Sequence, residues 1–80
     1  MYYLKNAPKQ LDELSDQIVK PLLGAILELE VNPRPTGYKK LKGRTGCRIR
    51  VGNYRIIYEI YDSELLIDVI ALGHRKDIYR

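Results

Sequence analysis

Residues 47–61 read CRIRVGNYRIIYEIY, and they carry the clearest structural pattern in the chain. Apolar and basic residues alternate before Gly52-Asn53, and a second, mostly apolar run follows it. Alternation with a period of two is typical of a strand that buries one face, and a Gly-Asn pair between two such runs predicts a tight hairpin. If the loop has two residues, Arg50 lies directly opposite Arg55. The other expected pairs are Val51 with Tyr54, Ile49 with Ile56, and Arg48 with Ile57.

A second turn at Asp62-Ser63 leads into a last strand over residues 65–72. The expected pairs are Ile60 with Leu65, Tyr58 with Ile67, and Ile56 with Val69. One face of the sheet then carries only apolar and aromatic side chains: Ile49, Val51, Tyr54, Ile56, Tyr58, Ile60, Leu65, Ile67 and Val69. A shift of one residue would move every one of them to the other face, so this coherent face supports the register.

The first half of the chain predicts helices. A short strand is expected at Tyr2–Lys5, and apolar residues then recur at helical spacing up to the turn Asn32–Pro35. Pro21 lacks a backbone N–H, which predicts a break or a kink there and hence a helical hairpin over residues 7–31. The expected fold is an α+β domain spanning residues 1–80, with the N-terminal strand and the helical hairpin packed on an antiparallel sheet of about four strands.

Charge is distributed unevenly along the 80 residues, whose net charge is +4. Residues 32–58 contain eight Lys and Arg residues and no Asp or Glu, whereas residues 1–31 and 59–80 each have a net charge of −2. Eight cations without an intervening acid repel one another unless water, salt or a polyanion screens them. The backbone of a nucleic acid is the partner that this pattern predicts.

Composition excludes several other classes of protein. The single Cys47 cannot form an intramolecular disulfide framework or a cysteine zinc cluster, and no metal or other cofactor is expected. The longest apolar run, Val69–Leu72, is far too short to span a membrane. We therefore expect a cytoplasmic protein that makes no contact with membranes.

The face opposite the predicted core carries Arg48, Arg50 and Arg55, and the same alternation places Leu72 and His74 on it where the last strand ends. Like charges directly opposite each other on neighbouring strands are destabilising by up to about 1 kcal/mol. Two adjacent guanidinium groups are useful where they bind one anion, because each can donate two hydrogen bonds to phosphate oxygens. The pattern therefore predicts a phosphate-binding site.

RNA can be cleaved without a metal when its own 2′-hydroxyl attacks the adjacent phosphate. This reaction needs a proton acceptor for the 2′-hydroxyl, cations for the phosphate and a proton donor for the leaving 5′ oxygen. The arginines suit the phosphate, and His74 and Tyr79 are the candidates for proton transfer.

Two motifs carry a family resemblance. The block RIRVGNYRIIYE, residues 48–59, follows KKLKG at residues 39–43 and precedes GHRKDIY at residues 73–79. In this order they resemble the RelE family of bacterial and archaeal toxins. The resemblance implies a ribosome-dependent mRNA endonuclease that cuts in the decoding site and is neutralised by a RelB-type antitoxin. The residue types favour a metal-independent reaction for it. Its partners would be that antitoxin, the ribosome and mRNA.

The resemblance also implies roles for individual residues. Arg48 and Arg50 occupy positions that are often basic in the family, and Arg55 matches its phosphate-stabilising arginine. Arg75 matches a residue that stabilises the leaving group or the phosphate, and Tyr79 one that orients the substrate base. His74 stands where relatives have lysine or histidine.

The identity of the general base is open at this stage. An arginine stays protonated at working pH, so His74 is the best candidate, and water or ribosomal RNA could also serve. We expect the basic segment with Lys39, Lys40, Lys42 and Arg44 to position the protein on ribosomal RNA. The alternatives are a gyrase-inhibiting toxin of the ParE type and a non-catalytic module that binds RNA or an antitoxin.

Overall fold

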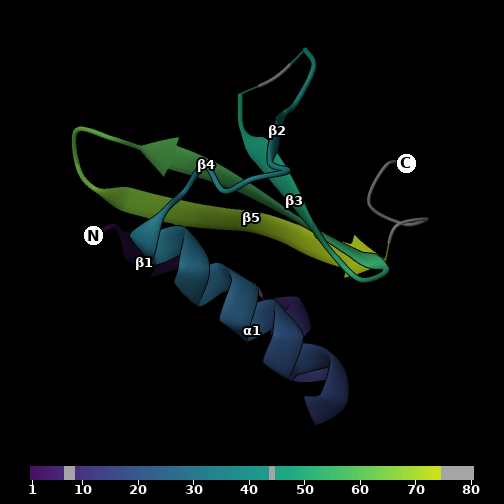
Figure 1. Cartoon of the computed structure of the whole chain (residues 1–80). Coiled ribbons are helices and arrows are strands. Elements are labelled where there is room, and N and C mark those ends of the chain that lie inside the picture. Colours follow the sequence, from purple (N-terminus) through teal and green to yellow (C-terminus); the bar gives the residue numbers. More distant parts are fainter. Residues whose placement is uncertain (7–8, 44, 75–80) are drawn as a thin grey trace.

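The computed structural model describes residues 1–6, 9–43 and 45–74. One α-helix covers one face of a five-stranded sheet whose strand order is β1-β5-β4-β3-β2 (Figure 1). Strand β1 runs parallel to β5, and the other neighbours are antiparallel, so the sheet is mixed. The predicted α+β class is confirmed, with five strands where about four were expected. The elements are β1 (Tyr3–Asn6), the 3-10 helix η1 (Lys9–Glu13), α1 (Asp16–Val31), β2 (Lys39–Lys40), β3 (Cys47–Val51), β4 (Tyr54–Tyr61) and β5 (Leu66–His74).

Helix α1 continues through Pro21, so the prediction of two helices separated at this proline is wrong. Pro21 lies in the second turn, where the missing N–H removes a single intrahelical hydrogen bond. The same helix buries Leu22, Ile26 and Leu29 against the sheet, and this burial outweighs the lost bond. The chain breaks instead before Ser15, which is the N-cap residue of α1.

The hydrophobic core lies between α1 and the sheet. Tyr58, Ile56 and Ile67 have no exposed surface, and Ile49 and Val69 are also buried. Val51, Tyr54 and Ile60 are partly buried against the same cluster. The predicted apolar face is confirmed except at Leu65, which lies in a turn and is 45% exposed.

The β3–β4 hairpin has the predicted register. Gly52 adopts a positive φ of 60°, which glycine accepts without strain and which a tight turn requires. Arg50 pairs with Arg55, and the remaining predicted pairs are also present: Val51 with Tyr54, Ile49 with Ile56, and Arg48 with Ile57.

The predicted register between β4 and β5 is wrong by two residues. The turn contains the four residues Asp62–Leu65, with Leu65 at a positive φ of 54°. Tyr61 therefore pairs with Leu66, and the other pairs at this end are Ile60 with Ile67 and Tyr58 with Val69. Because the shift is an even number of residues, these side chains keep their predicted faces.

A β-bulge then reverses the faces along the rest of β5. The register changes between Ile57 and Tyr58, and Ile70 is left without a partner between the paired residues Val69 and Ala71. An extra residue on one strand moves every later side chain to the opposite face. Leu72 consequently pairs with Ile56 in the core, and His74 pairs with Tyr54. The prediction that Leu72 and His74 share the face of the arginines is wrong.

Candidate nucleic-acid interface

A cavity of about 490 Å³ lies at the free edge of β3. Strand β2 pairs only with Arg48 and Cys47, so the part of β3 beyond them has no neighbouring strand on this side among the described residues. The volume falls within the range of about 300–1,000 Å³ that is typical of ligand pockets. The lining residues come from α1, the following loop, β2, β3 and β4: Ala25, Glu28, Pro35, Thr36, Gly37, Lys39, Arg48, Ile49, Arg50, Val51 and Arg55.

Four of these lining residues are cations, and they come from three neighbouring strands. Arg48 pairs with Lys39 on one side, and Arg50 pairs with Arg55 on the other. Arg50 and Lys39 are exposed, whereas Arg55 is only 7% exposed and is the one buried charged side chain in the described part of the chain. The structure thus brings Arg48, Arg50 and Arg55 to one cavity.

The cavity extends around the edge of the sheet. Ile49 and Val51 belong to the face that packs on α1, whereas Arg48, Arg50 and Arg55 alternate with the core residues and lie on the other face. Ala25 and Glu28 reach the cavity from α1, and residues 35–37 close it from the loop. An extended polyanion crossing this edge would meet the arginines on one side and the flank of α1 on the other.

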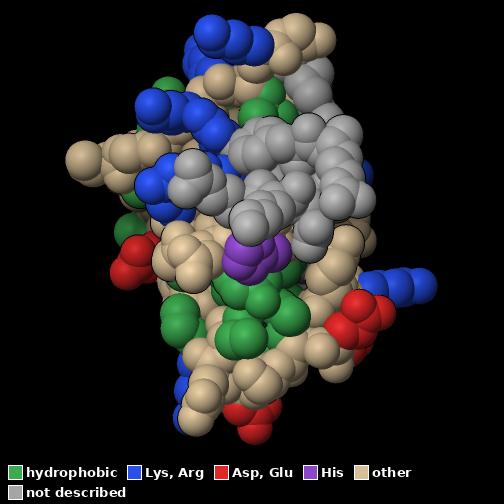
Figure 2. Space-filling model, turned by 90° about the vertical axis from the view of Figure 1, so that its right-hand side faces the viewer, with side chains coloured by type: hydrophobic (Ala, Val, Ile, Leu, Met, Phe, Trp, Pro, Cys, Tyr) green, Lys and Arg blue, Asp and Glu red, His purple; other side chains and the backbone are tan. Residues whose placement is uncertain are grey.

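The surface around this edge is basic. Figure 2 shows most of the Lys and Arg side chains of that view gathered in its upper part, away from most of the Asp and Glu side chains. Lys39 and Lys40 form β2 and are exposed, and Lys42 follows them in the exposed loop. The sites predicted at Arg44, Arg75 and Tyr79 lie outside the described residues.

His74 lies at the end of β5, close along the backbone to the arginine pair but on the opposite face. Its neighbour Gly73 pairs with Arg55, while His74 itself pairs with Tyr54. The two rings are in edge-to-face contact, with centroids 5.7 Å apart at an angle of 76°. The side chain of His74 is exposed and therefore accessible to a ligand that passes this end of the sheet.

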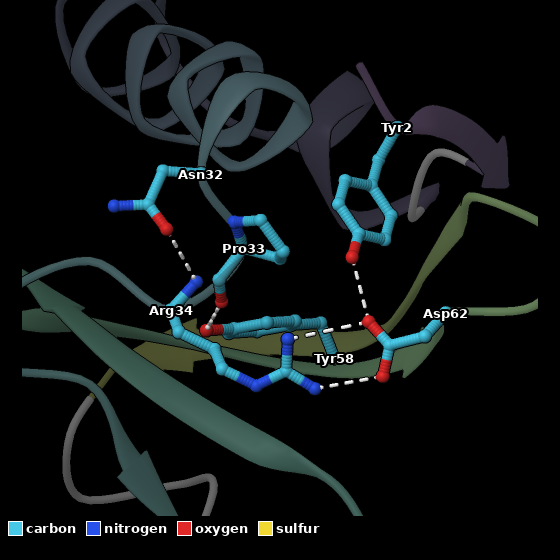
Figure 3. Close-up of polar contacts among 6 residues, drawn as sticks. All are labelled: Tyr2, Asn32, Pro33, Arg34, Tyr58 and Asp62. Atoms are coloured by element: carbon cyan, nitrogen blue, oxygen red, sulfur yellow. Dashed lines mark hydrogen bonds and ion pairs between the residues drawn. The ribbon is translucent and has the colours of Figure 1, made fainter.

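Arg34, one of the eight cations in residues 32–58, makes polar contacts at the opposite end of β4 (Figure 3). Its guanidinium donates to both carboxylate oxygens of Asp62, at 2.9 and 3.2 Å, and the hydroxyl of Tyr2 donates to Asp62 Oδ1 at 2.6 Å. The hydrogen bonds from Arg34 and Tyr2 hold the pKa of Asp62 below its ordinary value, and the hydrogen bond to Asp62 raises the pKa of Arg34. The charge of Arg34 is thus neutralised within the protein.

The loop after α1 is also held by a buried hydrogen bond. The hydroxyl of Tyr58 donates to the carbonyl oxygen of Pro33 at 2.7 Å, and Figure 3 shows the tyrosine ring lying beneath the loop. Burial raises the pKa of Tyr58, so the hydroxyl keeps its proton and donates it. Because residues 35–37 line the cavity, this bond helps to set the position of one cavity wall.

Cys47 is buried in β3 as part of the hydrophobic core. Burial raises the pKa of its thiol, which disfavours the reactive thiolate. Across the described ranges, no three His, Cys, Asp or Glu side chains come together in a way that could hold a metal ion. No helix in these ranges combines the length and the apolar character needed to cross a bilayer.

Comparison with known proteins identifies the family. A family model described as the ParE toxin of the type II toxin-antitoxin system parDE matches residues 2–79. The chain belongs to this toxin family. It is also 27% identical over 75 residues to the mRNA interferase toxin RelE of Escherichia coli K12, an alignment that covers 90% of this chain and 78% of that protein.

Solved structures with the same fold are RelE toxins, which makes this chain a RelE-type toxin. The archaeal RelE–RelB complex from Pyrococcus horikoshii OT3 matches with a TM-score of 0.79 and 27% identity, over 95% of this chain and 97% of that one. The RelB–RelE complex from Methanococcus jannaschii matches with a TM-score of 0.71 and 31% identity, over 99% of this chain and 95% of that one. The resemblance to RelE toxins predicted from the sequence is confirmed.

Two features of the toxin were not predicted from its sequence. Glu28 reaches the cavity from α1. In the sequence, the one sign of this position is that Glu28 lies one turn after Ala25, at the side of the apolar stripe of the helix. The pair of Arg34 and Asp62 joins residues that are 28 positions apart, and no local pattern indicates such a contact.

Proposed function

We propose that this RelE-type toxin cleaves mRNA on the ribosome without a metal, through attack of the RNA 2′-hydroxyl on the adjacent phosphate. The observation that carries the proposal is the cross-strand pair of Arg50 and Arg55, which lines one cavity together with Arg48 and Lys39. Four cations around one cavity would attract the negatively charged phosphates of RNA. The names of the curated relatives, mRNA interferases, support the same activity.

The arginines would act on the phosphate. During the reaction the 2′ oxygen forms a bond to phosphorus and the 5′ oxygen leaves, so the products are a 2′,3′-cyclic phosphate and a 5′-hydroxyl. Negative charge builds up on the non-bridging oxygens in between, and guanidinium groups fixed on rigid strands stabilise it with little reorganisation. Arg55 is buried against the sheet and so is the most rigidly held of the three.

Proton transfer would fall to other groups, because arginine stays protonated. One proton leaves the 2′-hydroxyl and one must reach the leaving 5′ oxygen. His74 is an exposed candidate for one of these steps. The resemblance adds Arg75 for the leaving group or the phosphate and Tyr79 for the substrate base.

The exposed lysines would position the toxin. Lys39, Lys40 and Lys42 lie along the edge of the sheet beyond the arginines. A lysine neutralises phosphate as a point charge without fixed geometry, which suits docking on ribosomal RNA better than chemistry. Arg44 belongs to the same segment of the sequence and is proposed for the same role.

An antitoxin of the RelB type is the proposed protein partner, in the cytoplasm where the ribosomes are. Two of the structures that this fold matches are complexes of RelE with RelB. A free basic edge would bind polyanions indiscriminately, so an inhibitor that brings carboxylates toward Arg48, Arg50 and Arg55 has a clear electrostatic advantage. The apolar part of the interface would then determine how slowly the complex dissociates.

The description of the matching family favours a second candidate, a ParE-type toxin that acts on DNA gyrase. Primer extension on a translated message distinguishes the two. New 5′ ends within the ribosomal decoding site are expected from the proposed function. Accumulation of cleaved DNA in the presence of gyrase, without RNA cleavage, would support the ParE-type activity. The absence of both products would support the third alternative, a non-catalytic binding module.

A further inference from the structure

Among the described residues that line the cavity at the edge of β3, Glu28 is the one carboxylate. It lies on α1, one turn after Ala25, and both residues face the cavity from the flank of the helix. The described part of the lining contains four cations, Lys39, Arg48, Arg50 and Arg55. A carboxylate in this position weakens the binding of an anion in the cavity. Anion binding alone therefore does not explain why an acid stands there.

The backbone of Glu28 is well fixed. Leu29, the next residue of α1, is fully buried, and Ile26 lies almost as deep in the core. The backbone carbonyl of Glu28 accepts a hydrogen bond from the N–H of Asn32 at 2.9 Å, which ends the helix. The side chain itself is exposed at the cavity. A carboxylate on a rigid helix can therefore be held close to a bound ligand without the cost of ordering a loop.

The other acids near the sheet are engaged elsewhere. Glu59 accepts a hydrogen bond from the hydroxyl of Tyr61 at 2.8 Å, and Asp68 accepts one from the side-chain amide of Asn6 at 3.3 Å. Asp62 is bound to Arg34 at the far end of β4. Glu28 is thus the acid that the described structure offers to a ligand in the arginine cavity.

We propose that Glu28 accepts the proton of the RNA 2′-hydroxyl, an inference that rests on the proposed function. The carboxylate takes the proton while the 2′ oxygen forms its bond to phosphorus and the bond from phosphorus to the 5′ oxygen breaks. Arg50 and Arg55 bind the non-bridging oxygens from the other side of the sheet edge. The leaving oxygen takes its proton from water or from a separate acid, for which His74 is the candidate. The carboxylate returns its proton to solvent after the step.

Single-turnover cleavage of ribosome-bound mRNA at neutral pH tests the proposal. Glu28→Gln keeps the shape of the side chain and removes the acceptor, so the rate at saturating ribosome should fall by about 10²–10⁴-fold. Glu28→Asp keeps the carboxylate and should retain more activity than Glu28→Gln. Glu64→Gln, an exposed acid in the β4–β5 turn, is the matched control and should cleave at the wild-type rate.

Separate measurements of ribosome binding and of the maximal rate distinguish catalysis from charge balance. Glu28→Gln removes a negative charge from a cavity that holds four described cations, so the variant should bind ribosomes at least as tightly as the wild type. Its maximal rate should nevertheless fall, and Glu28→Asp should recover part of that loss.

Three results would overturn the proposal. Cleavage by Glu28→Gln at the wild-type rate would remove Glu28 from the reaction and leave the proposed function intact. A variant that only binds ribosomes more weakly, with an unchanged maximal rate, would assign Glu28 to positioning. If the wild type itself does not cleave translated mRNA, the proposed function fails and this inference fails with it.

Discussion

The two ends of β4 differ in how they accommodate arginine. Just beyond its last residue, Arg34 binds both oxygens of Asp62, and Tyr2 donates a further hydrogen bond to the same carboxylate. Near its first residue, Arg55 lies opposite Arg50, and Arg48 and Lys39 line the same cavity. At the first of these ends an arginine pairs with a carboxylate, whereas at the second several cations line one cavity.

This difference indicates that Arg34 stabilises the fold, whereas Arg50 and Arg55 belong to the candidate functional site. The pair of Arg34 and Asp62 joins the N-terminus, the loop after α1 and the β4–β5 turn, which is what an arginine that stabilises the fold is expected to do. Arg50 and Arg55 are like charges directly opposite each other, and an anion bound between the two side chains would offset their mutual repulsion. The contrast predicts that substitutions at the two ends have opposite effects on stability and activity.

The largest effect is expected at the arginine pair. Arg55→Ala should reduce single-turnover mRNA cleavage by at least about 10²-fold, the usual loss on removal of one fixed charge donor. Arg50→Ala is the matched exposed variant and should also reduce cleavage, while the melting temperature rises slightly because the cross-strand repulsion is gone. Arg55→Lys keeps the charge and controls for the packing of this buried side chain. Full activity of Arg55→Lys together with unfolding of Arg55→Ala would assign Arg55 to the structure.

The second largest effect is expected at the loop after α1, which Tyr58 of β4 holds through a hydrogen bond. Tyr58→Phe removes a buried donor and leaves the carbonyl of Pro33 without its partner, so urea denaturation should show a loss of about 1–3 kcal/mol. Tyr61→Phe is the matched control, because its hydroxyl bonds to Glu59 at a partly exposed position and should contribute less. Equal losses for the two variants would mean that the loop is not held by Tyr58.

A smaller effect is expected at the exposed lysines. Replacement of Lys39, Lys40 and Lys42 by glutamine should weaken ribosome binding and reduce its salt dependence by roughly two to three phosphate contacts. The cleavage rate at saturating ribosome should change much less than in the arginine variants. Binding measured at several salt concentrations provides the test. An unchanged salt slope would show that these lysines face another partner.

The smallest effect is expected at Asp62. Its pKa is lowered by Arg34 and Tyr2, so the carboxylate stabilises the fold at neutral pH, and this contribution is lost as the pH falls through the lowered pKa, below the ordinary value of 3.8. Asp62→Asn should therefore melt slightly below the wild type at pH 7, and the gap should close in acid. Cleavage should be unchanged. A gap that persists in strong acid, or a loss of cleavage, would contradict the contrast between the two ends.

The hairpin of β3 and β4 was predictable because an alternating pattern and a two-residue turn determine the register together. The pairing of Arg50 with Arg55, and with it the centre of the candidate site, followed directly. The helical region was less predictable, because the burial of Leu22 and its neighbours keeps α1 intact through Pro21. Tertiary packing of this kind is not visible in a local pattern.

The remaining differences arise from backbone irregularities and long-range contacts. The four-residue turn contains Leu65 at a positive φ, where glycine or asparagine would be the usual signal. The bulge at Ile70 has no marker in the sequence, and it alone moved His74 to the other face. Glu28 meets the arginines through the packing of a helix on a sheet, so only the three-dimensional structure places it in the site.

The central claim is that RNA is cut by its own 2′-hydroxyl at the arginine edge, and a single modified message tests it most directly. Primer extension first maps the cut made by the wild-type toxin on the ribosome, and the nucleotide on the 5′ side of that cut is then replaced by its 2′-deoxy form. The account predicts a 5′-hydroxyl and a 2′,3′-cyclic phosphate at the normal cut and complete loss of cleavage at the deoxy position. Continued cleavage of the deoxy message, with a 5′-phosphate product, would contradict it.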